Sequence, residues 1–256
     1  MSKRYFVHVP YPQLNQRLPY LLERHLNPEI FFSAPALEAL VPAELAAQAE
    51  TLREAGLSCT IHSPFMDLNP GSFEAKLREA TRLRFDQVLD AADLLDPEVM
   101  VFHPGFDRWR YGETRDLWLK ESLPIWEGVL ARVQGRRTII AVENIFEEEP
   151  STLKALLGAI DHPQFRHCFD VGHWNLFNTV GMEQWFAELG DQIAEVHIHD
   201  NHGDKDQHAP PGEGGIDFEL FFRLMERYAP NAAYTIEAHS PENLERSLVA
   251  LQPYLF

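Results

Sequence analysis

Residues 138–144 read TIIAVEN, a run of β-branched and apolar residues that ends in a glutamate and an asparagine. Near-continuous apolar runs of this kind are typical of parallel strands that helices cover. Glu143, alone at the end of the run, would be buried without a partner, which costs free energy unless a cation or a donor meets it. The segment therefore predicts a buried strand with a polar site at its carboxyl end.

The same strand pattern recurs along the chain. Further strand-like runs cover residues 4–9, 29–33, 58–63, 99–103, 166–170, 193–200 and 233–238. Helical patterns lie between them, and residues 12–26 form the weakest one. Pro42 is expected to open a helix that Gly56 ends, and Ser240 with Pro241 to open the last helix.

Eight strand–helix units in 256 residues, with no Gly/Ser-rich linker between them, predict an α/β fold. We expect a single (β/α)8 TIM barrel that occupies residues 1–256 as one domain. An open doubly wound sheet is the alternative, but it lacks a glycine-rich phosphate loop after the first strand. In a barrel, the loops that follow the strands form the active-site face.

Composition restricts the partners of the chain. It has 22 Lys and Arg against 39 Asp and Glu, a formal charge of −17, whereas binding to duplex DNA needs clustered basic residues. We therefore expect no duplex DNA partner. No apolar stretch approaches the roughly 20 residues of a membrane span, and the start MSKRYFVHVPYP does not resemble a signal peptide. Cys59 and Cys168 are expected to be buried thiols, and the expected compartment is the cytoplasm.

Imidazoles and carboxylates accumulate where the predicted strands end or in the loops that follow. These potential metal ligands are His62, His103, Glu143, Asp170, His173, His197, Asp206, His208 and Glu237. Mixed nitrogen and oxygen ligands suit Zn, Mn or Fe. A catalytic zinc usually takes three protein ligands, so nine ligands predict two or three divalent ions, with zinc expected and Mn or Fe as alternatives. Taken singly, each residue has a simpler explanation, such as a turn histidine, a helix cap or a solvated pair.

The order of these ligands resembles the xylose isomerase-like barrel superfamily, in particular its endonuclease IV branch (AP endonuclease family 2). The resemblance covers the third to the eighth predicted strand, and the loop PGEGGID also resembles that branch. The motifs correspond to the strand-end histidines His62 and His103, the bridging Glu143, the D-x-x-H pair Asp170 and His173, the histidine His197 of H-x-x-D, the D-x-H pair Asp206 and His208, and the last-strand Glu237. The resemblance implies a three-zinc site.

Single-metal sugar isomerases and epimerases of the same superfamily use a smaller set. Their pattern maps onto Glu143, Asp170, His197 and Glu237, with His173 as a substrate contact. These enzymes do not need His62, His103, Asp206 and His208 as a complete group of ligands. The presence of all four additional ligands favours hydrolysis.

The expected function is therefore metal-dependent hydrolysis of a phosphoester in a small phosphorylated or nucleotide-bearing metabolite, with a cobamide among the candidates. Glu143 would bridge two ions and Glu237 would orient or deprotonate water, which makes these two the expected catalytic residues. The alternatives are a single-metal sugar or sugar-phosphate isomerase or epimerase and a barrel that binds ligands without catalysis.

Other residues near the predicted site are candidate substrate contacts. They are His8, Asn144, Trp174 and His199. The segment RWRYGETR, residues 108–115, is basic and aromatic and is a candidate to hold a phosphorylated ligand; a solvated loop is its simpler interpretation. The oligomeric state stays open.

Overall fold

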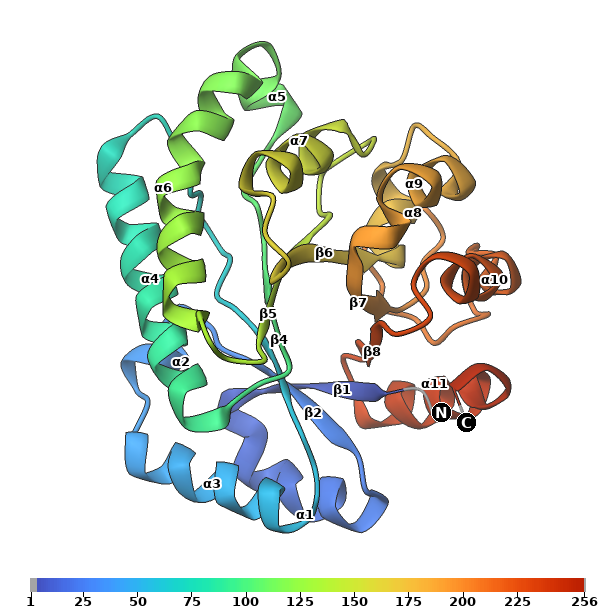
Figure 1. Ribbon diagram of the computed structural model, residues 1–256. Coiled ribbons are helices and arrows are strands. Elements are labelled where there is room, and N and C mark those ends of the chain that lie inside the picture. Colours follow the sequence, from blue (N-terminus) through green and yellow to red (C-terminus); the bar gives the residue numbers. More distant parts are fainter. Residues whose placement is uncertain (1–3, 256) are drawn as a thin grey trace.

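Eight parallel strands close into a barrel in the computed structural model, which describes residues 4–255 (Figure 1). The predicted single-domain (β/α)8 barrel is thereby confirmed. The strands follow chain order around the barrel: β1 Tyr5–Pro10, β2 Asn27–Phe31, β3 Thr60–His62, β4 Val99–Phe102, β5 Ile139–Glu143, β6 Phe165–Asp170, β7 Ile193–Ile198 and β8 Ala233–Ile236. The expectation about a leader falls partly on residues 1–3, which lie outside the described residues.

Closure of the barrel depends on the pairing of the first strand with the last. Tyr5 of β1 lies opposite Tyr234 of β8, and all eight neighbouring strand pairs are parallel. Because the strands are parallel, their carboxyl ends meet at one face of the barrel, and every strand-end side chain lies near that face.

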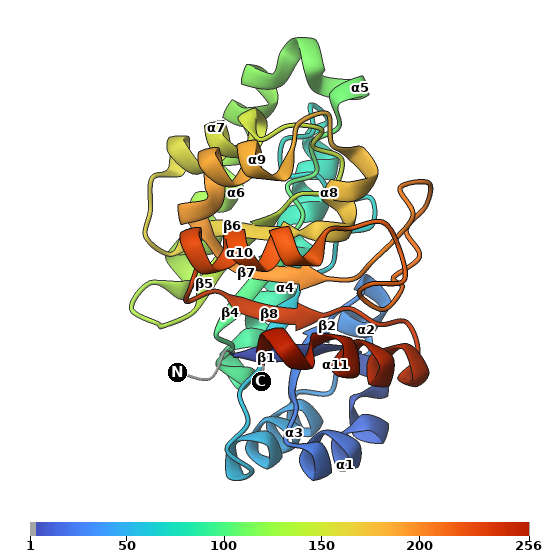
Figure 2. The same ribbon diagram turned by 90° about the vertical axis from the view of Figure 1, so that its right-hand side faces the viewer.

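Helices surround the barrel on its outer side (Figure 1). They are α1 Leu14–Arg24, α2 Ala34–Glu38, α3 Pro42–Glu54, α4 Ala75–Leu95, α5 Arg108–Tyr111, α6 Arg115–Val133, α7 Ser151–Ile160, α8 Val171–Phe177, α9 Met182–Leu189, α10 Phe218–Tyr228 and α11 Pro241–Leu255. The short helix α5 projects beyond the others in both views (Figure 2). Within residues 4–255, none of the helices combines the length and the apolar character needed to cross a bilayer.

The sequence signals for two helix starts are confirmed. Pro42 is the first residue of α3, where its missing N–H costs nothing. The Ser240 hydroxyl accepts a hydrogen bond from the Asn243 N–H at 3.1 Å and so caps α11. Both cysteines are free and buried, as expected.

One apolar position of α4 does not face the core. The helical spacing of Leu77 with Phe85 and Val88 predicts a buried side chain, but Leu77 is 49% exposed. It lies in the first turn of α4, at the mouth of the cavity above the barrel. Leu77 thus lines the cavity instead of the core.

Candidate metal centre

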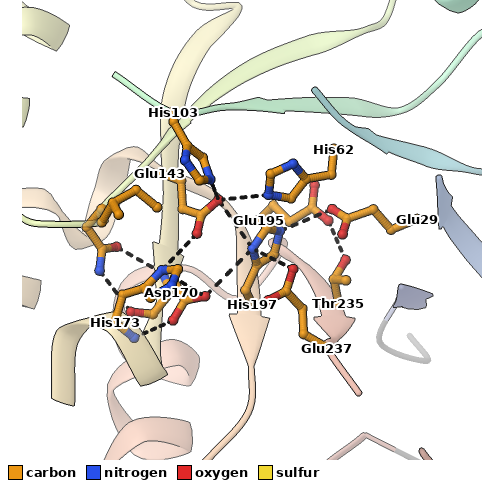
Figure 3. A network of polar contacts seen from close by, with 12 residues as sticks. Glu29, His62, His103, Glu143, Asp170, His173, Glu195, His197, Thr235 and Glu237 are labelled. Atoms are coloured by element: carbon orange, nitrogen blue, oxygen red, sulfur yellow. Dashed lines mark hydrogen bonds and ion pairs between the residues drawn. The ribbon is translucent and has the colours of Figure 1, made fainter. Parts of the chain in front are cut away.

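All nine predicted ligands form one connected set at the carboxyl ends of the strands, and Figure 3 shows His62, His103, Glu143, Asp170, His173, His197 and Glu237 of this set. Strands β3 to β8 each place at least one of them at the strand's last residue or at the residue directly before or after it. Asp206 and His208 come from the loop after β7. The sheet therefore assembles ligands that lie far apart in the sequence.

Glu143, at the end of β5, lies at the middle of the set. Its Oε2 is 3.4 Å from His62 Nε2, 3.3 Å from His103 Nε2 and 3.5 Å from His197 Nδ1. Its Oε1 is 3.0 Å from His173 Nδ1. A carboxylate and four imidazoles gathered in this way are ligand types that suit a divalent transition-metal ion.

His197 presents one ring nitrogen to the centre and the other to a buried carboxylate. Its Nδ1 lies 3.4 Å from Glu237 Oε1 and 3.8 Å from Asp170 Oδ2. Its Nε2 lies 3.1 Å from Oε1 of Glu29 on β2. Such a carboxylate behind a metal-binding histidine fixes the ring and its tautomer.

The D-x-H pair approaches the set from the side of β6 and β7. Asp206 Oδ2 lies 2.9 Å from His208 Nε2 and 3.6 Å from His173 Nε2. The His208 ring stacks on His199, with centroids 3.9 Å apart. His208 has a φ of 47°, in the left-handed region that non-glycine residues rarely adopt, so its backbone stores strain at the site.

The loop that carries this pair is attached to a buried carboxylate. Asp200 Oδ2 accepts hydrogen bonds from the N–H groups of Gly212 and Gly214, at 2.9 and 2.8 Å. Its Oδ1 accepts two more, from Asn201 and Ile216. A Cβ on Gly214 would come within 2.3 Å of the carboxylate, so only glycine fits there.

The polar atoms of the centre fit a bound cation. Buried atoms without a hydrogen-bond partner gather here: His103 Nε2, both Glu143 oxygens, His173 Nδ1, His197 Nδ1, His199 Nδ1 and His208 Nδ1. Each such orphan costs about 1–3 kcal/mol, and a cation between imidazoles and carboxylates would satisfy them together. Several groups of residues place their ligand atoms within 4.8 Å of one another, among them His62, Glu143 and His197; Asp170, His173 and His199; and His199, His208 and Glu237.

The charges of the centre shift the pKa values of its members in opposite directions. Burial opposes the charged form of His62, but the Glu143 carboxylate outweighs burial and raises the His62 pKa to about 9. Burial alone would raise the pKa of Glu143, yet the imidazoles of His197 and His103 hold it well below its ordinary value. Without a cation, the centre thus favours the charged form of Glu143 and the protonated form of His62, and a bound cation would displace that proton.

The four predicted substrate contacts occupy different places. His8 lines the cavity above the barrel, and its Nδ1 lies 3.2 Å from Glu29 Oε2. Asn144 instead braces β5 against β6, because it bonds both the Asp170 carbonyl and the Asp170 N–H. Trp174 packs against the hydrophobic core. His199 is fully buried at 3.2 Å from Asp170, so it lies among the ligands rather than at the cavity surface.

Two buried glutamates of the site were missed by the sequence reasoning. Glu29 on β2 and Glu195 on β7 are both fully buried beneath the ligands (Figure 3). Burial and the nearby Glu29 raise the Glu195 pKa to about 8, and the Thr235 hydroxyl donates to Glu195. The signal that singled out Glu143, a glutamate inside an apolar strand run, was present for Glu29 in NPEIFF.

The segment 108–115 forms α5, the following turn and the start of α6. Arg110 lines the cavity, whereas Arg108 pairs with Glu148 at 2.7 Å. Tyr111 is buried and Trp109 is 86% exposed. Only part of this segment therefore faces the site.

Comparisons with known proteins agree with the fold. The sequence profile described as xylose isomerase-like TIM barrel matches residues 28–254, which confirms the resemblance. The uncharacterized protein MJ1311 of Methanocaldococcus jannaschii is 29% identical over 206 residues, covering 76% of this chain and 69% of the relative.

Solved structures share the whole barrel. A D-tagatose 3-epimerase-like protein has a TM-score of 0.84 at 23% identity, covering 100% of this chain and 97% of its own. Endonuclease IV from Thermus thermophilus has a TM-score of 0.73 at 23% identity, covering 98% of each chain. Several further similar structures are sugar epimerases. At these identities the likeness establishes the fold alone.

Proposed function

The chain belongs to the xylose isomerase-like TIM-barrel family, and we propose that it is a divalent-metal enzyme that isomerises or epimerises a sugar or sugar phosphate. One observation carries this proposal. Nδ1 of His197 lies 3.4–3.8 Å from carboxylate oxygens of Glu143, Asp170 and Glu237. One imidazole and three carboxylates on four consecutive strands suffice for a single ion.

The two glutamates suit proton transfer beside a carbonyl. Glu143 and Glu237 reach His197 from β5 and from the end of β8, on two sides of the ring (Figure 3). A bound divalent ion supplies Lewis-acid polarisation of a substrate oxygen. One carboxylate would remove the proton from the carbon beside the carbonyl. In an isomerisation, a carboxylic acid would then return a proton to the neighbouring carbon; in an epimerisation, it would return a proton to the opposite face of the same carbon. The similar sugar epimerase structures agree with this chemistry.

Phosphoester hydrolysis is the second candidate, and a specific observation favours it. His62 and His103 lie on Glu143 at 3.4 and 3.3 Å, and Asp206 lies between His173 and His208. A one-ion isomerase leaves these ligands without a cation, whereas a site of two or three ions uses all of them. In that reaction a water oxygen bonds to phosphorus, Glu237 accepts the water proton, and the ester P–O bond breaks.

Metal content and isotope uptake separate the two candidates. Elemental analysis of the metal-loaded protein should give one ion per chain for the isomerase and two or three for the hydrolase. In deuterated water the isomerase places deuterium on carbon and leaves phosphorus untouched. In oxygen-18 water the hydrolase places one labelled oxygen in the released phosphate or phosphomonoester. Labelled phosphorus product without deuterium on carbon would overturn the leading proposal.

The double variant Asp206→Ala/His208→Ala gives an independent test. If the extra ligands hold a further ion, the variant loses one ion per chain and its turnover collapses. If they only border the substrate, the metal content stays the same and the change appears in KM. His202→Ala in the same loop is the matched control, since the His202 side chain is exposed and is not among the residues that line the cavity.

A further inference from the structure

The cavity above the metal centre has two walls of opposite character. It encloses about 1070 Å³ and opens at the carboxyl ends of the strands. The loops after β7 and β8 line it with charged and imidazole side chains, such as Asp206, His208 and His239. The end of β2 and the loops after β3 to β6 contribute most of its apolar side chains, among them Phe31, Phe65, Met66, Phe146, Leu176 and Phe177, together with the polar Asp67, Asn69, Asp107 and Arg110. A ligand that fills this cavity therefore contacts a cluster of apolar side chains as well as the polar centre.

The apolar wall is held in place by ring contacts that reach the metal ligands. Phe65 stacks on the His103 ring at 4.3 Å between centroids and on Phe31 at 5.6 Å. Phe146 meets Phe177 edge to face at 5.3 Å. The wall therefore begins directly beside the ligand His103, within reach of any molecule bound at the centre.

The outer part of this wall is exposed to an unusual degree. Met66 is 73% exposed and Phe146 is 52% exposed, and with Leu77 they border the same cavity mouth. Apolar side chains that gather at one opening mark a surface that a ligand covers. The cavity leads to the metal centre, so the ligand that covers the wall is the substrate.

A free monosaccharide does not match this wall. It carries a hydroxyl on almost every carbon, and each hydroxyl placed against Phe65, Met66 or Phe146 would lose its hydrogen bonds to water without a replacement. An aromatic ring gains there instead, through sulfur contact at Met66 and edge-to-face contact at Phe146. The guanidinium of Arg110, at the same cavity, suits the face of such a ring.

We propose that the substrate is a sugar or sugar phosphate that carries both a carbonyl group and an aromatic ring, as a keto-glycoside with an aromatic aglycone does; simple aryl glycosides and nucleosides then serve as binding probes for the ring. The ring lies against Phe65, Met66 and Phe146, and the sugar reaches the metal centre. The identity of the sugar part rests on the proposed function, whereas the subsite for the ring rests on the cavity wall alone.

The test compares matched ligands that differ only in the ring. Calorimetry on the metal-loaded protein measures binding of p-nitrophenyl and methyl glycosides of the same sugar, over several sugars, and of adenosine against ribose. We expect the aromatic member of at least one pair to bind about tenfold more tightly. Phe146→Ser and Met66→Ser should each reduce that advantage about threefold or more, in line with about 0.5–1.5 kcal/mol for one aromatic contact.

Two exposed apolar residues outside the cavity provide matched controls. Leu83 on α4 is 54% exposed and Val249 on α11 is 73% exposed, and Leu83→Ser and Val249→Ser should leave the advantage unchanged. Equal binding within every pair, or an advantage that survives both cavity variants, would overturn the proposal. The binding test needs no turnover, so it is independent of the proposed reaction. If the aromatic ligands bind more tightly but no deuterium is incorporated on carbon, the isomerase proposal is wrong and the subsite for the ring still holds.

Discussion

Replacement of Asp200 by asparagine should release the loop that brings Asp206 and His208 to the metal centre. The buried Asp200 carboxylate accepts four backbone N–H groups, two on each oxygen. The backbone of Asp200 also pairs with Ala209, directly after the D-x-H pair. The side chain touches no substrate-facing group, so its role is to position the loop.

The structure sets the size of the effect. In Asp200→Asn an NH2 group replaces one carboxylate oxygen, so the two backbone N–H groups that donated to that oxygen lose their acceptor. If the amide rotates by 180°, the other two N–H groups lose theirs instead. Two unpaired donors at about 1–3 kcal/mol each amount to about 2–6 kcal/mol. Since about 1.4 kcal/mol is a tenfold change in an equilibrium constant, the open fraction of the loop should rise at least about 30-fold.

Limited proteolysis measures this opening directly. Lys205 is an exposed trypsin site inside the loop, and mass spectrometry follows cleavage after it in the metal-free protein. Cleavage limited by opening should accelerate at least about 30-fold, in proportion to the open fraction, and the loaded variant should lose one ion if the loop holds one. Asp217→Asn is the control, because Asp217 caps α10 through Leu220 and asparagine caps equally well. Equal cleavage rates in Asp200→Asn and the control would refute the reasoning.

Other outcomes follow from the same centre. Glu143→Gln should lower turnover by roughly 10²- to 10⁴-fold and reduce metal occupancy with an unchanged circular dichroism spectrum; activity within a few-fold of the parent would contradict the central role of Glu143. Glu29→Gln should weaken metal binding by about 10- to 100-fold, measured by chelator competition, and unchanged affinity would show that the support of His197 is dispensable. The pKa of His62 is raised from 6.5 to about 9 in the folded, metal-free protein. The resulting stabilisation is fully present below pH 6.5 and is lost as the pH rises to about 9. Urea midpoints of the metal-free protein should therefore fall between pH 6.5 and 9 while metal affinity rises, and a rising midpoint would oppose the assignment. With a charge of −17, the chain should not bind undamaged duplex DNA at physiological salt; salt-sensitive binding in a filter or polarisation assay would restore a DNA substrate.

The barrel and most of its ligands were readable from consecutive residues. Each strand is a short apolar run, and a histidine or carboxylate at its end is visible in the same few letters, as in TIIAVEN or RHCFD. Because parallel strands in a closed barrel end on one face, strand position alone places these side chains together. No knowledge of the contacts between distant residues was needed for that step.

The surroundings of the ligands depended on contacts that the sequence does not display. Glu29 lies 168 positions before His197 and meets it only through the register of the barrel. His199 faces Asp170 because the inward side of β7 continues past its last residue, and Leu77 lines the cavity instead of the core.

The sequence by itself determined the barrel, the strand-end ligands and the expectation of a cation among them, because periodicity and strand ends are local properties. Only the tertiary structure decided which carboxylate supports His197, how Asp200 anchors the loop of the D-x-H pair, and that one wall of the cavity is apolar. These features arise where loops of different strands meet. Their conformations follow from packing and hydrogen bonds between residues far apart in the chain, which no local pattern encodes.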